Sequence, residues 1–270
     1  MGKIVTIASH KGGVGKTTTA LNFAYSLSRL GGSVLLVDVD PQGGMTVATN
    51  VKKHNGSGLV DYLSGNSQLQ DVISQTKARR LSIMGIGSIN HDSIARLEQL
   101  AAHGALKKAL TIFAKYYDYV IVDAPAGLGC LPTALLNASD AVILVVQCRS
   151  LALKTLPPML ALIDWVQKSS NPNLILEGVL INMYNQSNPT ESQMFSEIQS
   201  AFPEQMFFTT TIPFDPVFED ISLQSVPAAM HNGAQAIAGR YIELSVEYKQ
   251  REMLRAQAEG ADDVADSGLF

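Results

Sequence analysis

Ser9-His10-Lys11-Gly12-Gly13-Val14-Gly15-Lys16-Thr17-Thr18 is a glycine-rich stretch that separates two segments of different periodicity. The residues before it, 3–8, are apolar and β-branched, as in a buried strand. The residues after it, 18–30, repeat apolar side chains at the spacing of a half-buried helix. The glycines are therefore predicted to form a strand-to-helix loop.

A loop of this kind can bind an anion. Glycine permits positive φ angles and close backbone approach, and the free N–H groups at the helix start favour a phosphate. Lys16 would add a positive charge near the β and γ oxygens of a nucleotide, and the Thr17 hydroxyl could bind Mg²⁺. A simple tight turn is the alternative, but the strand, glycines, Gly-Lys-Thr and helix together favour a phosphate-binding P-loop.

The rest of the chain alternates predicted strands with predicted helices. Strands are predicted at residues 33–38, 81–84, 119–123, 141–146, 174–181 and 206–212. Helices are predicted at residues 59–63, 94–117 with an interruption at Gly104, 151–166, 191–201 and 234–256. This pattern predicts an α/β fold of the P-loop NTPase type, with a doubly wound, mostly parallel sheet and helices on both faces.

Length and composition favour one domain. The 270 residues are 46% hydrophobic and 16% charged, as in a globular protein. We expect a single ATPase domain at 1–257, followed by an acidic, disordered tail at 258–270. With no leader pattern before the first strand and no apolar run of roughly 18 residues, a cytoplasmic protein is expected. Cys130 and Cys148 lack metal-site spacing and are predicted to be small core residues.

The glycine-rich stretch departs from the common P-loop, because His10 stands where the first glycine is usual and Lys11 is added. This KGGVGKTT form resembles the deviant Walker A motif of the ParA/MinD family of dimeric ATPases. The resemblance implies that Gly12 to Thr18 bind ATP. It also implies that Lys11 reaches the phosphates of a second copy in an ATP-dependent homodimer.

Carboxylates follow two of the predicted strands. Asp123 fits a Walker B acid that binds Mg²⁺, although it could also cap the next loop. Asp38 and Asp40 would repel one another unless a cation or donors compensate them, and a magnesium nucleotide would do so. The resemblance implies that Asp40 lies near the attacking water and the Mg²⁺, so Lys11, Lys16 and Asp40 are the predicted catalytic residues. The predicted metal ligands are Thr17, Asp40 and Asp123.

Asn182 ends the strand predicted at 174–181. It resembles the asparagine with which this family reads the base, with the backbone near Pro213 closing over the adenine. The alternative is an ordinary turn asparagine.

The resemblance spans nearly the whole chain, and the form Asp38-Val39-Asp40-Pro41-Gln42 is closer to the ParA/Soj branch than to nitrogenase-reductase relatives. It implies an ATPase that dimerises on ATP and binds nucleoid DNA without sequence preference. A ParB-like or other activating partner would stimulate hydrolysis and release it, which positions DNA or a large protein cargo.

The DNA-binding step is where the sequence departs from the family. No Lys or Arg lies between Lys168 and Arg240, although ParA-type proteins place DNA-binding cations in this region. The sequence offers other basic clusters, each of which could equally be a solvated face: Lys52/Lys53, Lys77/Arg79/Arg80, Lys107/Lys108/Lys115 and Lys249/Arg251/Arg255. A MinD-like membrane switch is disfavoured by the acidic end of the chain. An adaptor that binds only protein partners remains an alternative.

Overall fold

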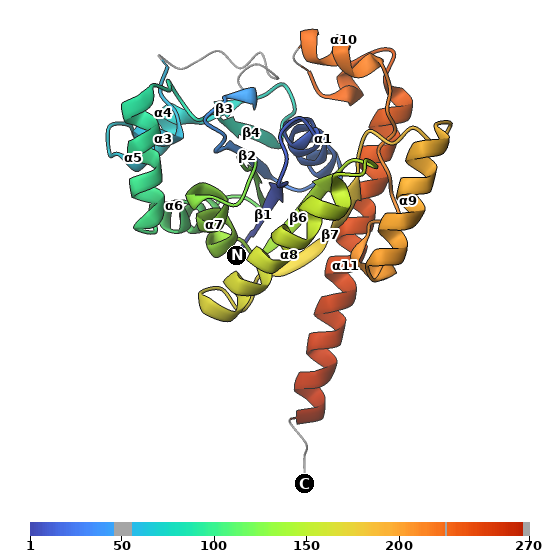
Figure 1. Cartoon of the computed structure of the whole chain (residues 1–270). Coiled ribbons are helices and arrows are strands. Elements are labelled where there is room, and N and C mark those ends of the chain that lie inside the picture. Colours follow the sequence, from blue (N-terminus) through green and yellow to red (C-terminus); the bar gives the residue numbers. More distant parts are fainter. Residues whose placement is uncertain (46–55, 225, 267–270) are drawn as a thin grey trace.

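A seven-stranded sheet forms the centre of the computed structural model, which describes residues 1–45, 56–224 and 226–266 (Figure 1). The strand order is β3-β4-β2-β5-β1-β6-β7, and every neighbouring pair is parallel except β3 with β4. The strands are β1 (Lys3–Ala8), β2 (Val34–Asp38), β3 (Ser74–Gln75), β4 (Leu81–Met84), β5 (Tyr119–Asp123), β6 (Ala141–Val146) and β7 (Ile175–Ile181).

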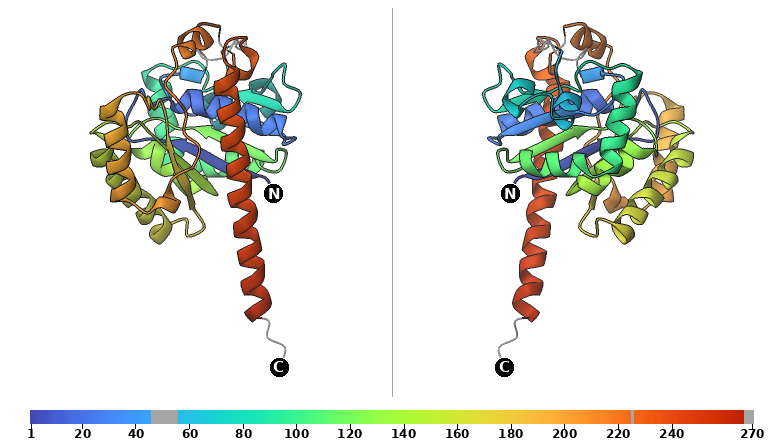
Figure 2. Two further views of the ribbon diagram at one scale, coloured as in Figure 1. Left: turned by 90° about the vertical axis from the view of Figure 1, so that its right-hand side faces the viewer. Right: turned by 90° about the vertical axis from the view of Figure 1, so that its left-hand side faces the viewer.

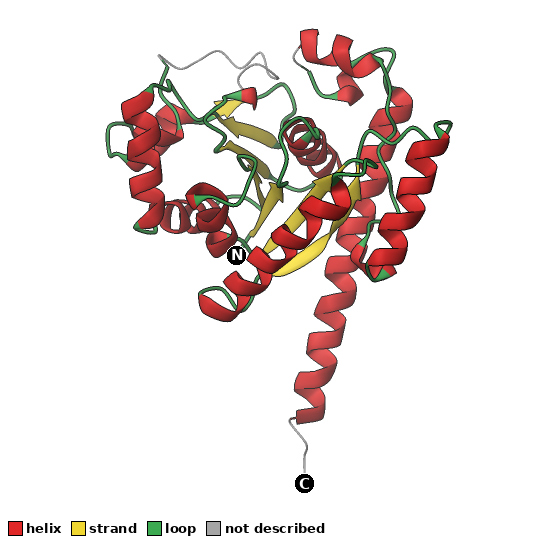
Figure 3. Cartoon of the chain, in the orientation of Figure 1, coloured by secondary structure: helices red, strands yellow, loops and turns green. Residues whose placement is uncertain are grey.

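Helices cover both faces of the sheet (Figure 3). One face packs against α1 (Lys16–Arg29), α10 (Val217–Gln224) and α11 (Gln235–Asp266), and the other against α5 (His91–Ala102), α6 (Ala105–Phe113), α7 (Cys130–Ala138) and α8 (Ala152–Ser169). The other helices within the described ranges are α3 (Leu59–Leu63), α4 (Leu69–Val72), α9 (Pro189–Ala201), and the 3₁₀ turns η1 (Glu204–Met206) and η2 (Ala228–Met230). The doubly wound, mostly parallel fold predicted from the sequence is confirmed.

The central strands are continuous apolar runs because both of their faces are covered. Every residue of β2, β5 and β6 is buried. The predicted break at Gly104 is also confirmed, since this glycine separates α5 from α6 with a φ of 78°. No helix in the described part of the chain is long and apolar enough to cross a membrane.

Three features differ from the sequence predictions. The strand expected at 206–212 is instead η1 followed by an irregular extended segment that meets β7 through the isolated Val179–Phe207 bridge and single backbone hydrogen bonds, such as Ile212 N–H to the Ile181 carbonyl at 3.0 Å. The sequence prediction did not name α4, α7, α10 or β3. Finally, α11 continues to Asp266, so the segment expected to be disordered from residue 258 is helical to that point; residues 267–270 lie outside the described part. Several alanines in this stretch favour the helix.

Helices α11 and α1 together form the hydrophobic core on their face of the sheet. The Phe23 and Tyr248 rings meet edge to face with centroids 5.3 Å apart, and Tyr241 and Leu244 are also buried. Figure 2 shows α11 running across the body of the protein and projecting beyond it. The core-forming part of α11 is therefore its first half.

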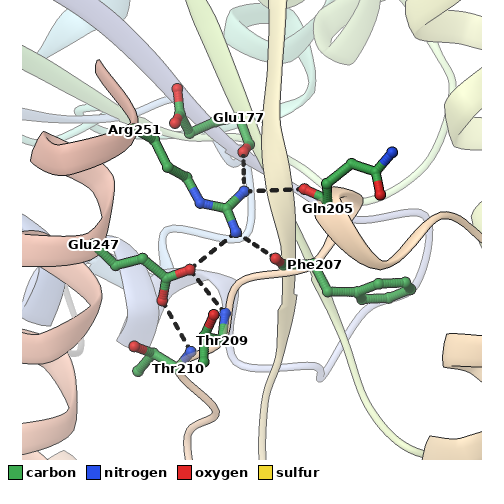
Figure 4. A network of polar contacts seen from close by, with 7 residues as sticks. All are labelled: Glu177, Gln205, Phe207, Thr209, Thr210, Glu247 and Arg251. Atoms are coloured by element: carbon green, nitrogen blue, oxygen red, sulfur yellow. Dashed lines mark hydrogen bonds and ion pairs between the residues drawn. The ribbon is translucent and has the colours of Figure 1, made fainter. Parts of the chain in front are cut away.

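A polar clamp, defined as Glu247 and Arg251, joins α11 to the irregular segment that follows η1 (Figure 4). The Glu247 carboxylate accepts hydrogen bonds from the backbone N–H groups of Thr209 at 2.8 Å and Thr210 at 2.9 Å. These N–H groups are therefore used by a side chain rather than by a strand ladder, which explains why no strand forms here.

Arg251 completes the clamp. Its guanidinium donates to the carbonyls of Glu177, Gln205 and Phe207 and forms an ion pair with Glu247 at 2.9 Å. Burial would raise the pKa of Glu247, but its backbone donors and Arg251 outweigh that effect and hold the pKa below its usual value. The clamp therefore satisfies backbone groups of three separate segments at once.

Replacing Arg251 with methionine should lower the free energy of unfolding by about 2–4 kcal/mol, because it leaves a partly buried carboxylate and several carbonyls without their donor. Urea unfolding followed by circular dichroism measures this change. Arg240→Met is the matched control, since Arg240 pairs with Glu243 on the exposed surface of the same helix. It should cost less than about 0.5 kcal/mol. Equal losses in the two variants would contradict the structural role of the clamp.

Candidate nucleotide-binding site

The loop from Ser9 to Gly15 joins β1 to α1 as the sequence predicts. Gly13 and Gly15 adopt φ angles of 74° and 86°, which other residues rarely tolerate. Gly15 is the N-cap of α1, and neither a capping side chain nor an acidic residue occupies the first turn of that helix. The first N–H groups of α1 are therefore free of side-chain acceptors and can bind an anion.

An open pocket of about 810 Å³ lies in front of this loop. Gly12, Gly13, Gly15, Lys16, Thr17 and Asp40 are among the residues that line it. Only 6% of the Lys16 surface is exposed, and its charge lies near Asp123. The structure thus brings most of the predicted phosphate-binding residues to one pocket at the carboxyl edge of the sheet.

Two buried carboxylates stand behind the loop. Asp38 and Asp123 are paired in the register of β2 and β5, and neither is exposed to solvent. Both oxygens of Asp123 and Oδ2 of Asp38 lack a hydrogen-bond partner among the described residues. Buried carboxylate oxygens without donors are energetically costly unless a cation or proton compensates them.

The pKa values of these acids reflect that cost. Burial raises the pKa of Asp123 to about 7, opposed by the nearby Thr17 hydroxyl and Lys16 ammonium. Burial and the neighbouring Asp123 charge raise the pKa of Asp38 well above its usual value. Thr17 and Lys16 offset only part of this cost, so the carboxylate oxygens beside Thr17 fit a divalent cation. Among the described residues no cluster of three or more His, Cys, Asp or Glu side chains could hold a metal without other ligands, so phosphate oxygens would have to complete the coordination.

Asp40 lies at the pocket and is only half-buried. Its N–H donates to Asp38 Oδ1 at 3.0 Å, and its own Oδ1 accepts from the N–H of Gln42 at 2.9 Å. These contacts fix the Asp40 side chain while its remaining oxygen can face the pocket. A water-orienting role is consistent with this position and stays a prediction.

Asn182 is buried against the loop. Its Nδ2 donates to the Val14 carbonyl at 2.7 Å, and its Oδ1 has no partner among the described residues. Two residues later, Tyr184 forms a parallel bridge with Pro213. The structure therefore places Asn182 beside the P-loop and Pro213 next to Tyr184, while base reading stays a prediction. The observed contact also gives Asn182 a role in holding the loop, which the sequence did not predict.

Lys11 is exposed and does not line the pocket that contains Lys16. The Ser9 hydroxyl forms hydrogen bonds with both backbone groups of Lys11: it donates to the carbonyl at 3.0 Å and accepts from the N–H at 3.1 Å. The backbone is thus fixed while the side chain extends outward, which is compatible with contact to a second copy.

Two further residues beside the P-loop were not among the predicted site residues, and one of them, Met183, lines the pocket. Met183 has a φ of 54°, which is unusual for a residue other than glycine, and it lines the pocket beside Gly15. Its sulfur accepts a hydrogen bond from Gln147, whose Nε2 also lies 3.4 Å from the Gly13 carbonyl. Gln147 follows the last residue of β6, so its position at a strand end was the available sequence signal.

The structure also shows which of the two cysteines is buried and which of the predicted basic residues are paired. Cys148 is buried as expected, but Cys130 is exposed because it begins α7 at the pocket rim, which corrects the prediction that both cysteines are core residues.

Arg251 and Arg255 form ion pairs with Glu247 and Glu177, so Lys249 is the one free cation among the three basic residues of the cluster on α11. Lys52 and Lys53 lie outside the described residues.

The open P-loop, the buried acids behind it and the parallel sheet define a P-loop nucleotide-binding protein. The AAA domain family matches residues 2–176. The sporulation initiation inhibitor protein Soj of Bacillus subtilis (strain 168) is 33% identical over 249 residues, covering 92% of this chain and 98% of Soj. The chromosome partitioning protein ParA of Myxococcus xanthus (strain DK1622) is 34% identical over 209 residues, covering 77% and 74%.

A solved structure shares the fold over almost the whole chain. Cobyrinic acid a,c-diamide synthase from Mycobacterium smegmatis, with a bound ATP analog and magnesium, superposes with a TM-score of 0.75 at 27% identity, covering 91% of this chain and 93% of the synthase. Together with the Soj and ParA relatives, these matches show that the chain belongs to the ParA/MinD family of ATPases, in its ParA/Soj branch.

Replacing Gly15 with alanine should disturb the loop, because a Cβ there would lie 2.3 Å from Asn182 Nδ2 at a φ of 86°. We expect a loss of about 1–3 kcal/mol in unfolding free energy and at least tenfold weaker binding of a fluorescent nucleotide. Gly239→Ala in α11 is the control, since no atom lies within 4 Å of its new Cβ, and it should stabilise the helix by about 0.5–1 kcal/mol. An unchanged urea midpoint for Gly15→Ala would show that the loop tolerates a side chain at this position, which would contradict the prediction.

Proposed function

We propose that this protein is a slow, magnesium-dependent ATPase that dimerises on ATP, binds nucleoid DNA without sequence preference and is released when a ParB-like or other activating partner stimulates hydrolysis. Such a cycle would segregate or position DNA or a large protein cargo in the cytoplasm. The single observation that carries this proposal is the open phosphate loop backed by uncompensated carboxylates, with Lys11 held outside its own pocket.

The chain's own residues account for phosphate binding. The N–H groups at the start of α1 would hold the β and γ phosphate oxygens, and Lys16 would neutralise part of their charge. Thr17, Asp40 and Asp123 would hold the magnesium ion, directly or through its waters. When bound, magnesium supplies positive charge that neutralises the transferring phosphoryl group.

Hydrolysis then requires an ordered water. Asp40 would orient that water, with Asp38 fixing the Asp40 backbone through the observed hydrogen bond. Positioning and charge neutralisation provide most of the catalysis of phosphoryl transfer, so no strong general base is needed. Turnover would stay slow until a partner completes this arrangement.

The relatives support the choice of nucleotide and biological role. The cobyrinic acid a,c-diamide synthase structure holds an ATP analog and magnesium, and the ParA relative is a chromosome partitioning protein. Asn182 and the backbone near Pro213 would surround the adenine. A MinD-like membrane switch or a protein-only adaptor is the alternative function.

An electrophoretic mobility-shift assay at low salt separates these functions. Wild-type protein should shift duplex DNA with ATP and magnesium, whereas Lys16→Ala should not. The absence of any ATP-dependent shift would exclude the DNA function, and ATP-dependent sedimentation with anionic vesicles would favour the membrane alternative.

Asp40→Ala should lower ATP turnover about 10- to 100-fold, because the water loses its orienting carboxylate. ATP binding should stay within about threefold, so a stable ATP dimer should accumulate in size-exclusion chromatography with light scattering. Asp164→Ala, which removes an exposed carboxylate of α8, is the control and should behave as wild type. Unchanged turnover in Asp40→Ala would remove this residue from the mechanism.

Lys11→Ala should bind ATP within about threefold of wild type but should neither dimerise nor turn over ATP, because its charge would act on the partner's phosphates. Mixing it with Lys16→Ala tests this directly. In the mixed dimer, Lys11 of the Lys16→Ala subunit can reach the nucleotide held by the Lys11→Ala subunit. Recovered hydrolysis supports action in trans, whereas two inactive variants that stay inactive when mixed would contradict it.

A further inference from the structure

Basic side chains gather at the amino edge of the sheet, where the parallel strands begin. They come from β1, the end of α1, the turn between β3 and β4, the end of α6 and the middle of α11. We call this group the amino-edge patch, and its members are Lys3, Arg29, Lys77, Arg79, Arg80, Lys115 and Lys249. In the linear sequence five of these residues come from three separate basic clusters, and Lys3 and Arg29 belong to none.

Contacts across the edge connect these segments. Arg80 Nη1 donates to the Gly31 carbonyl at 2.8 Å, just beyond the end of α1. Hydrogen bonds from Ser33 are the largest cause of the lowered pKa of Asp118, and the charges of Arg80 and Lys249 contribute further. The β3–β4 turn, the start of β5 and the middle of α11 therefore meet in one place.

Lys3 extends the patch along the same edge. Its ammonium lies 3.9 Å from Glu252 of α11, and the Tyr119 hydroxyl donates to the same side chain at 3.1 Å. The N-terminus lies beside α11 at the point where this helix leaves the body of the protein (Figure 2). Lys3 and Lys249 thus occupy the same part of the surface.

The acidic groups on this edge are already engaged. Asp118 accepts from the N–H and hydroxyl of Ser33 at 2.7 and 2.8 Å, and Asp140 accepts from the Ile4 N–H at 2.7 Å. By contrast, most of the cations are free. Within the described ranges, no carboxylate lies within 4.0 Å of the basic groups of the following exposed residues: Arg29, Lys77, Arg79, Lys115 and Lys249.

Helix dipoles explain only part of the patch. Arg29 lies in the last turn of α1 and Lys115 lies just after α6, where a cation stabilises the helix. That reason does not apply to Lys77 and Arg79 in a turn or to Lys249 in the middle of α11. Arg251 and Arg255, two and six residues beyond Lys249, pair with carboxylates instead.

We propose that the amino-edge patch binds the phosphate backbone of duplex DNA. The proposal rests on the proposed function and locates its DNA contact on a surface other than the cation-free turn at residues 212–215. Spread ammonium and guanidinium groups neutralise successive phosphates without reading bases, which gives binding without sequence preference. An open pocket of about 480 Å³ lies within the patch, lined by Lys3, Lys115 and the 70% exposed Tyr116 together with Asp118 and Glu252.

The location separates DNA binding from catalysis. The nucleotide pocket is at the carboxyl edge of the strands, and the patch is at their amino edge. A strand of five residues spans roughly 17 Å. Charge changes in the patch should therefore leave basal ATP hydrolysis within about twofold of wild type.

The test measures binding of a fluorescent 60-base-pair duplex by anisotropy, with ATP and magnesium, at several salt concentrations. The variants are Lys77→Glu/Arg79→Glu and Lys249→Glu. We expect at least tenfold weaker binding for the double variant and a salt slope reduced by about one for each phosphate that the variant no longer neutralises. Lys107→Glu/Lys108→Glu is the matched control, because it reverses two exposed charges at the opposite end of α6.

The outcomes separate this proposal from the proposed function. Weaker DNA binding in the patch variants, with normal binding in the control and normal basal hydrolysis in all, supports the patch. Normal binding by the patch variants overturns the patch while leaving the DNA function intact. Wild-type protein that binds no duplex at low salt overturns both. Loss of binding to anionic vesicles in variants that keep DNA binding assigns the patch to a membrane and overturns this proposal. Circular dichroism and thermal unfolding confirm that each variant is folded.

Discussion

A parallel sheet must be covered on both faces, and this constraint determines most of the arrangement seen here. Each crossover returns over a face of the sheet, so the buried strands all end at the same edge. The P-loop, Asp38, Asp40, Asp123 and Asn182 follow four different strands, yet they meet because those strands are parallel and level. The site is thus a geometric result of the topology.

The same site holds two buried carboxylates whose negative charges are unfavourable next to each other. Asp38 and Asp123 are buried beside each other, and three of their four carboxylate oxygens lack hydrogen-bond donors among the described residues. In a region with only a structural task, an apolar pair would be more stable. The acids raise one another's cost of ionisation, and a nearby cation would relieve it. This stored cost couples the stability of the sheet edge to ligand binding.

The sequence was sufficient for the parts that depend on local pattern. Apolar runs predicted the buried parallel strands, and Gly15-Lys16-Thr17 predicted the loop and the start of α1. The parts that could not be predicted depend on partners distant in sequence. Glu247 takes the N–H groups of Thr209 and Thr210 across 38 and 37 residues and prevents a strand. Asn182 holds Val14 across 168 residues. No periodicity encodes either contact, and no local pattern indicates that Cys130 faces solvent while Cys148 does not.

Helix α11 has a consequence for how the chain becomes folded during synthesis. The ribosome makes α1 long before α11, but the two helices share one core through Phe23, Tyr241 and Tyr248. Until α11 emerges, the side of α1 that packs against α11 has no cover, and the segment after η1 has no Glu247 or Arg251 to bind. The growing chain therefore exposes the part of this core that α11 covers until α11 has been made. A nascent chain stalled before α11 should be a strong client for chaperones that recognise apolar surface.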